Sequence, residues 1–189
     1  MADLVAGVPE APDDLLRPTP CQQYRLGDLL EHLGTMAVAF RAAATKETEG
    51  IGDRPASGDM DHLAEDWRTR IPLDLLALAE AWSSPSAWTG MTRIAATDMP
   101  GEMVGLIALD EVVIHGWDLA KATDQPFTCE ESALAVCYDL VASFSAPGQE
   151  EMRARLFGPE VPVPEDAPLL DRLLGLSGRD PEWSRSAGS

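Results

Sequence analysis

One segment, residues 100–122, constrains the fold of this chain more than any other. Pro100 stands where a first helical turn tolerates a missing amide donor, and Glu102 adds negative charge near the helix start. The turn-forming residues 124–126 end the segment. Apolar side chains surround the middle of the segment almost completely, and a helix of that kind is buried. We therefore predict a buried helix that runs to Ala122.

Three other segments have the three- and four-residue apolar spacing of amphipathic helices. They cover residues 26–44, a stretch that starts near residue 61 or 72 and ends at 82, and residues 132–145. A short apolar stub at residues 2–8 precedes them. No segment alternates as a strand would, and residues 50–58 and 88–99 are expected to be a loop and an irregular stretch. Four helices with polar connections predict an all-α, antiparallel four-helix bundle.

The C-terminal part of the chain has a different character. After Pro147, prolines alternate with valines at residues 161–164, and this run cannot be a central strand because proline donates no ladder hydrogen bond. We predict an extended Pro-rich strap, followed by a short helix at Leu169 to Leu176. With 189 residues in total, the chain fits a single domain, 1–189, in which residues 146–189 pack on the bundle.

Charge and cysteine content exclude several classes of partner. The chain has 32 acidic and 14 basic residues, a formal net charge of −18, which opposes binding to nucleic acid or to an anionic membrane. It has no apolar run of about 18 residues and no signal-peptide pattern. Its three cysteines, Cys21, Cys129 and Cys137, form no paired motif. We expect a cytoplasmic protein in a reducing compartment.

Polar residues on the 100–122 helix form a candidate metal site. Glu111, His115 and Asp118 lie at positions i, i+4 and i+7, within about 40° of one direction around the helix. An exposed Glu and His pair at this spacing would contribute only a few tenths of a kcal/mol. Buried among apolar neighbours, however, these side chains need partners, and a divalent cation is one way to supply them.

The remaining two histidines differ in their surroundings. His32 lies beside the core leucines of the 26–44 helix, where it is either a third ligand or a boundary residue with a hydrogen-bonding neighbour. His62 is surrounded by polar residues and is expected in solvent. Two histidines and one carboxylate would leave an open position on Zn²⁺, as in catalytic sites. Ni²⁺ and Fe²⁺ also suit such ligands. No phosphate-binding loop or nucleophile elbow is present.

Four stretches of sequence carry a resemblance to a known family. The chain resembles the DinB/YfiT-like superfamily, and most closely the small metal-binding proteins similar to the N-terminal domain of mycothiol-dependent maleylpyruvate isomerase. The matching stretches are Arg17-Pro-Thr-Pro-Cys21, Leu29-Leu-Glu-His-Leu33, Leu109-Asp-Glu-Val-Val-Ile-His-Gly-Trp-Asp-Leu-Ala120, and Leu156-Phe-Gly-Pro159 through residues 166–176.

The resemblance implies both a ligand set and a chemistry. It implies a four-helix bundle in which His32, Glu111 and His115 hold the metal and Asp118 has a catalytic role, handling a proton or orienting a thiol. Enzymes of the superfamily use the metal to bind a low-molecular-weight thiol such as mycothiol as thiolate, which attacks a small electrophile. A metal ion favours this step because it deprotonates a thiol that coordinates to it.

Two departures from the family shape the expected function. The first helix is short, which would leave an apolar flank uncovered and favours a homodimer. The separate C-terminal domain of the isomerase has no counterpart here, which argues against isomerase activity itself. Three hypotheses follow: a metal-dependent thiol S-transferase, a non-catalytic bundle that binds metal or a small ligand, and a relative whose site stays empty.

Overall fold

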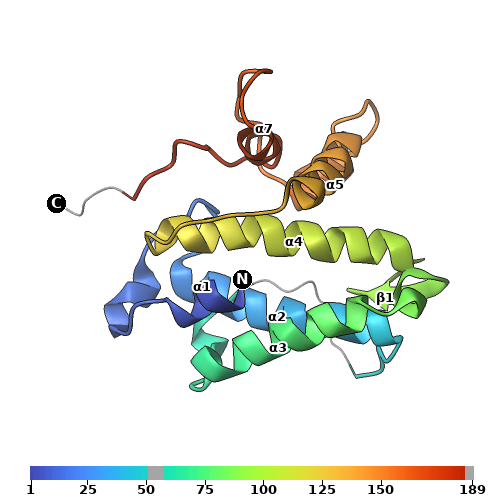
Figure 1. Cartoon of the computed structure of the whole chain (residues 1–189), viewed down its shortest axis with the longest axis horizontal. Coiled ribbons are helices and arrows are strands. Elements are labelled where there is room, and N and C mark those ends of the chain that lie inside the picture. Colours follow the sequence, from blue (N-terminus) through green and yellow to red (C-terminus); the bar gives the residue numbers. More distant parts are fainter. Residues whose placement is uncertain (51–57, 186–189) are drawn as a thin grey trace.

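The structure is a computed structural model that describes residues 1–50 and 58–185 (Figure 1). Its elements are α1 (Ala2–Ala6), α2 (Leu26–Thr45), α3 (Trp67–Trp82), β1 (Met91–Ile94), β2 (Thr97–Pro100), α4 (Gly101–Ala122), α5 (Glu131–Ser143), α6 (Glu150–Leu156) and α7 (Leu169–Leu176), with 3₁₀ turns at Pro12–Leu16, Met60–His62 and Pro85–Trp88. The protein is a mostly helical bundle, which confirms the predicted fold class. Within the described residues, no helix is long and apolar enough to cross a membrane.

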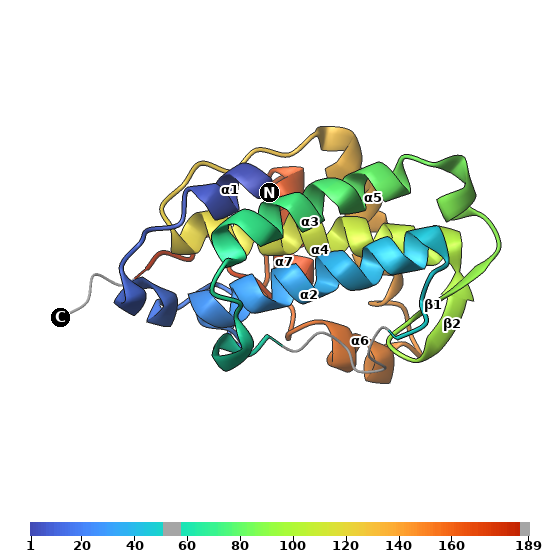
Figure 2. The same ribbon diagram turned by 90° about the horizontal axis from the view of Figure 1, so that it is seen from below.

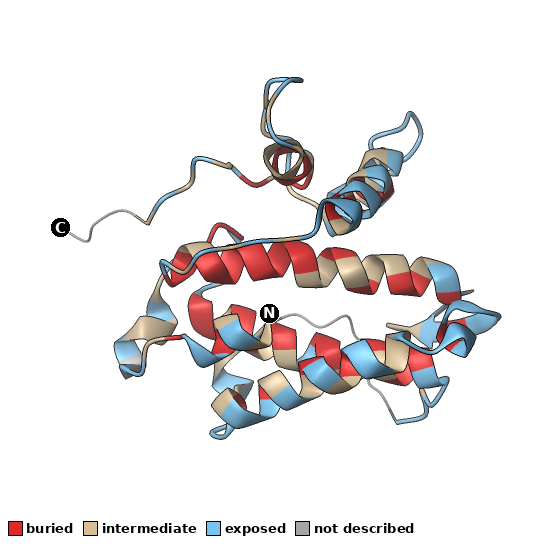
Figure 3. Cartoon of the chain, viewed as in Figure 1, coloured by how far each residue is buried: buried red, intermediate tan, exposed pale blue. Residues whose placement is uncertain are grey.

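Helix α4 lies between two apolar clusters and contributes to both (Figure 3). One of its faces packs against α2, in a cluster that α3 also joins, and the opposite face packs against α5, in a cluster that α7 also joins. The first cluster takes Val104, Ala108, Leu119 and Ala122 from α4, and the second takes Val113, Ile114 and Trp117. The prediction that this helix is buried is confirmed, because it has an apolar partner on each side.

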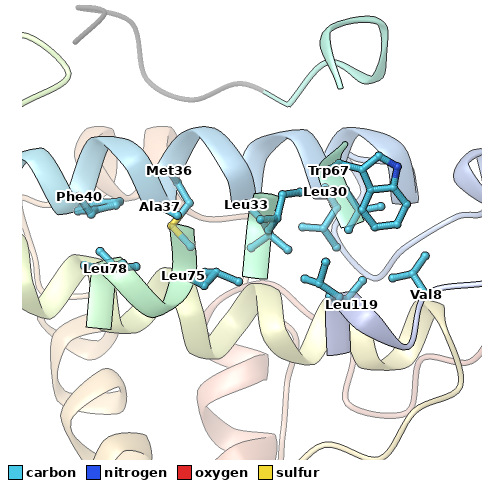
Figure 4. Close-up of a cluster of buried hydrophobic side chains, with 14 of the residues drawn as sticks. Val8, Leu30, Leu33, Met36, Ala37, Phe40, Trp67, Leu75, Leu78 and Leu119 are labelled. Carbon is cyan, nitrogen blue, oxygen red and sulfur yellow. The ribbon is translucent and has the colours of Figure 1, made fainter. Parts of the chain in front are cut away.

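Helices α2 and α3 run in the same direction, whereas α4 runs against both (Figure 2). Gly34 of α2 lies against Ile71 of α3. Further along both helices, Arg41 of α2 pairs with Asp74 of α3. The leucines of the two helices follow the same order in Figure 4. The predicted antiparallel bundle was therefore wrong for this pair. After α2 the chain returns to the start of that helix, where the Met60 amide donates to Asp28 Oδ1 at 2.9 Å.

A small hairpin of β1 and β2 stands where an irregular stretch without strands was expected, so that expectation was wrong. Its two turn residues, Ala95 and Ala96, have φ of 45° and 64°, as a two-residue hairpin turn of the primed type requires. Asn and Gly usually occupy such positions, so the Ala-Ala turn gives no sequence signal. The hairpin is anchored by Thr92, whose Oγ1 donates to the Ala43 carbonyl of α2 at 2.7 Å.

Several boundaries differ from the predictions. Helix α3 starts at residue 67 and contains Pro72, and α5 covers 131–143 instead of 132–145. The short helix α6 was not predicted. The stub α1, the extended strap after residue 157 and α7 match their predictions, and the Val161 amide donates to the Gly175 carbonyl to hold the strap on α7. Of the loop predicted at 50–58, residues 51–57 lie outside the described part of the chain.

Candidate metal centre

Three of the predicted site residues meet between α2 and α4. We call His32, Glu111 and His115 the metal triad. The Glu111 Oε2 atom lies 3.1 Å from His32 Nε2 and 3.3 Å from His115 Nε2. The helical spacing of four residues places Glu111 and His115 one turn apart on α4, and the packing of α2 against α4 brings His32 to them. The donor atoms of the three side chains all lie within 4.8 Å of one another.

This geometry and this chemistry fit a divalent transition metal. Two ligands bound at about 2.0–2.1 Å to a tetrahedral ion are about 3.3 Å apart, which is close to the two distances to Glu111. Two imidazoles and a carboxylate are a ligand set for Zn²⁺, and imidazole also suits nickel and iron. The His32 and His115 side chains are nearly inaccessible to solvent, whereas the Glu111 side chain is 29% exposed. The triad is therefore accessible from the side of Glu111.

The second ring nitrogen of His115 has its own partner. His115 Nδ1 lies 2.9 Å from Asp118 Oδ2, and the Asp118 side chain is completely buried. A carboxylate that accepts a hydrogen bond from Nδ1–H fixes the ring and leaves Nε2 facing Glu111 and His32. Asp118 also binds Arg179, whose Nη2 donates to Oδ2 at 3.0 Å. Asp118 therefore supports His115 from behind and does not line the exposed side of the triad.

Tyr24 packs against both histidines. Its ring centroid lies 5.1 Å from that of His32 and 6.0 Å from that of His115, and its hydroxyl lies 3.4 Å from His32 Nδ1. Thr19 holds the turn that carries Tyr24, because its hydroxyl donates to the carbonyls of Cys21 and Tyr24. Burial, together with nearby negative charge, raises the pKa of Tyr24 to about 12, so its hydroxyl keeps its proton.

Electrostatics in the triad favour charged forms of two residues. Burial alone would raise the pKa of Glu111, but hydrogen bonds from His115 and His32 hold it well below its usual range. Burial alone would lower the pKa of His115, whereas its hydrogen bonds to Asp118 and Glu111 raise it to about 9. The site therefore holds a carboxylate beside an imidazolium until a cation takes the place of the proton.

Cys21 belongs to a second group of close donors. Its Sγ, a His115 nitrogen and an Asp118 oxygen all lie within 4.8 Å of one another. Burial raises the pKa of the Cys21 thiol, against the opposing charge of Arg179. Because Asp118 already binds the Arg179 guanidinium and His115 Nδ1, this group is less suited to a cation than the metal triad.

Asp110 is a buried carboxyl beside the metal triad. Among the described residues, its Oδ1 atom is the only buried side-chain nitrogen or oxygen without a hydrogen-bond partner. Burial, followed by the charge of the adjacent Glu111, raises its pKa to about 7. A carboxyl in this position is more stable when it carries its proton, because burial disfavours the charged form.

Sequence reasoning placed the metal triad and Asp118 but missed three of their neighbours. Tyr24 lies outside the predicted 26–44 helix, and Arg179 lies 64 residues after His115, so no helical periodicity links either residue to the site. Asp110 stands beside Glu111, and its position on the apolar side of α4 was a signal that could have identified it. His62 is exposed, as predicted, with 76% of its side chain accessible.

Comparisons with known proteins agree with this architecture. The family model described as the mycothiol maleylpyruvate isomerase N-terminal domain matches residues 1–120. Two uncharacterized proteins, from two strains of Mycobacterium tuberculosis, are each 28% identical over 174 residues, which is 88% of this chain and 86% of theirs. No solved structure gives a significant match. The matched region includes all of the metal triad and Asp118 but ends before Arg179.

Proposed function

Because the chain belongs to the mycothiol maleylpyruvate isomerase N-terminal domain family, we propose that it is a metal-dependent thiol S-transferase. In this proposal the enzyme joins a low-molecular-weight thiol, such as mycothiol, to a small electrophile. The observation that carries the proposal is the metal triad, in which three donor atoms converge and one side remains accessible at Glu111. A closed structural site would instead need a fourth protein ligand.

The residues of the site have separate roles in this proposal. His32, Glu111 and His115 would hold the metal, with Zn²⁺ favoured by the ligand set. When bound, the metal supplies a Lewis acid that lowers the pKa of a coordinated thiol, so that thiolate is available near neutral pH. Tyr24 contacts both histidine rings and limits their movement. Asp118 orients His115 from the buried side and is assigned to positioning, not to proton transfer at the substrate.

The reaction forms one carbon–sulfur bond. The thiol loses its proton to solvent, and the sulfur lone pair attacks the electrophilic carbon. The displaced electron pair moves to an acceptor atom of the substrate, which is then protonated, or leaves with a leaving group. The exposed edge of Glu111 marks the side from which thiol and electrophile would approach.

The test is thiol consumption by the full chain loaded with Zn²⁺. Free thiol is measured with a panel of activated alkenes, epoxides and alkyl halides, with mycothiol as thiol and a mycothiol-dependent isomerase assayed in parallel. We expect turnover by the wild type and by the exposed-site control His62→Ala, and none by His115→Ala. Tight Zn²⁺ binding without thiol consumption would instead support a non-catalytic binding bundle. Failure to bind any transition metal would contradict both metal-dependent hypotheses and favour a relative whose site stays empty.

A further inference from the structure

Arg179 reaches the metal centre from the far end of the chain. It follows α7, and its side chain is only 10% exposed. Helix α7 ends in a Schellman motif, in which the Gly178 amide donates to the Gly175 carbonyl and the Arg179 amide donates to the Leu174 carbonyl. Gly178 has a φ of +83°, which favours glycine, and its α-carbon packs on Gly158. This turn directs the Arg179 side chain toward α4.

The guanidinium of Arg179 holds the Asp118 carboxylate at both oxygens. Arg179 Nη2 donates to Oδ2 at 3.0 Å, and Nε lies 3.4 Å from Oδ1. A two-point contact between guanidinium and carboxylate fixes the plane of the carboxylate as well as its position. In that plane, Oδ2 also faces His115 Nδ1 at 2.9 Å. The orientation of the His115 ring therefore depends on a residue 64 positions further along the chain.

The charges of Arg179, Asp118 and His115 favour the same arrangement. Asp118 is completely buried, and a buried carboxylate is costly unless it is paired and hydrogen-bonded. Arg179 supplies the pairing, and its Nη1 atom donates to the Ser177 carbonyl at 3.0 Å, which holds the guanidinium in place. His115 can then donate a hydrogen bond from Nδ1–H to the Asp118 carboxylate and keep Nε2 directed at Glu111 and His32.

We propose that Arg179 is a positioning residue of the metal centre, which acts through Asp118 to keep the Nε2 atom of His115 directed at the metal. The proposal rests on the metal site of the proposed function. It also makes the C-terminal segment part of the same functional domain as the bundle, although the family match ends at residue 120. Outer partners of this kind change metal affinity by about 10–100-fold.

The experiment compares Zn²⁺ affinity, by competition with a chromophoric chelator, for the full-length wild type, Arg179→Gln and a matched control. The control is Arg153→Gln, because Arg153 also anchors the C-terminal segment, donating to the Gly158 and Leu176 carbonyls, but has no contact with the site. We expect about a tenfold loss of affinity for Arg179→Gln and less than about twofold for Arg153→Gln. In an Asp118→Asn background, Arg179→Gln should change affinity by less than about twofold, because its effect passes through Asp118.

A spectroscopic measurement separates positioning from general stability. In the Zn²⁺-loaded wild type, the long-range proton–nitrogen NMR spectrum should show a single His115 tautomer with the proton on Nδ1. In Arg179→Gln we expect this signal to shift or broaden, while thermal unfolding confirms that the variant is folded. If the wild type binds Zn²⁺ and Arg179→Gln has the same affinity and the same NMR signal, this proposal alone is overturned. An equal loss in Arg153→Gln would also overturn it, and a wild type that binds no metal would overturn it together with the proposed metal site.

Discussion

Two histidine–aspartate pairs in this protein have the same local geometry but different surroundings. In each pair the residues are three positions apart, and Nδ1 of the histidine lies 2.9 Å from Oδ2 of the aspartate. The pair of His62 and Asp59 has side chains that are 76% and 54% exposed, whereas the values for His115 and Asp118 are 9% and 0%. We call these the exposed pair and the buried pair.

The difference between the pairs shows what burial adds to a short hydrogen bond. Water competes for both partners of the exposed pair and screens their charges, so such a pair contributes little. In the buried pair the same contact raises the pKa of His115 and orients its ring, because no water replaces the carboxylate. The buried pair also has Glu111 on one side and Arg179 on the other. Spacing and distance alone therefore do not identify a functional pair.

The largest expected effect is the loss of metal binding when the buried histidine is removed. His115→Ala should lower Zn²⁺ affinity by more than about 100-fold, beyond the range that outer partners control, because a direct ligand is lost. His62→Ala, its match in the exposed pair, should leave affinity unchanged within about twofold. Competition with a chromophoric chelator measures both. Similar losses in the two variants would remove the distinction between the pairs.

The next largest expected effect is a dependence of metal affinity on pH, caused by the protonation of His115 in the buried pair. Metal needs Nε2 of His115 without its proton, and below the pKa of about 9 the proton competes. Affinity should therefore rise with pH, by about tenfold for each pH unit, and should level off near pH 9. Titrations at pH 6, 7 and 8 would give the slope, with His62→Ala expected to give the same one. A flat profile would contradict the imidazolium in the metal-free site.

The aspartates of the two pairs should differ by a smaller factor. Asp118→Asn should lower Zn²⁺ affinity by about 10–100-fold, because the amide cannot replace a carboxylate that orients His115 and binds Arg179. Asp59→Asn should change it by less than about twofold. The same chelator competition measures this, and thermal unfolding in excess chelator serves as the control for folding. An unchanged affinity in Asp118→Asn would limit the function of the buried pair to stability.

Asp110 is a second buried carboxyl on α4, and it can be compared with Asp118. Asp110 has an oxygen without a partner and a pKa raised to about 7, so the unfolded state releases its proton at lower pH than the folded state does. Its contribution to stability therefore falls as pH rises from about 4 to 7 and stays low above that. Asp110→Asn should increase the free energy of unfolding by about 1–2 kcal/mol at pH 8 and by less at pH 5. Denaturant unfolding in excess chelator measures this, and a larger gain at pH 5 would contradict the raised pKa.

Local periodicity determined the helices and part of the site. The apolar spacing of residues 26–44 and 100–122 depends only on neighbours within one helix, and both predicted helices are present as α2 and α4. The same helical geometry places Glu111, His115 and Asp118 on one stripe. The Ala-Ala turn of the hairpin and the direction of α3 relative to α2 were missed. The first lacks the usual turn residues, and the second depends on how the chain returns between the helices.

Helical periodicity left His32 as either a ligand or a boundary residue, and only the family resemblance implied it as a ligand; no feature of the sequence linked Arg179 to Asp118. His32 meets Glu111 across 79 positions of sequence, and Arg179 meets Asp118 across 61. Contacts at such separations follow from how helices pack, and helical periodicity carries no information about them. The amino-acid sequence by itself therefore determined a buried α4 with Glu111 and His115 one turn apart. Only the packing of α2 and of the turn after α7 against that helix brings His32 to Glu111 and Arg179 to the buried pair.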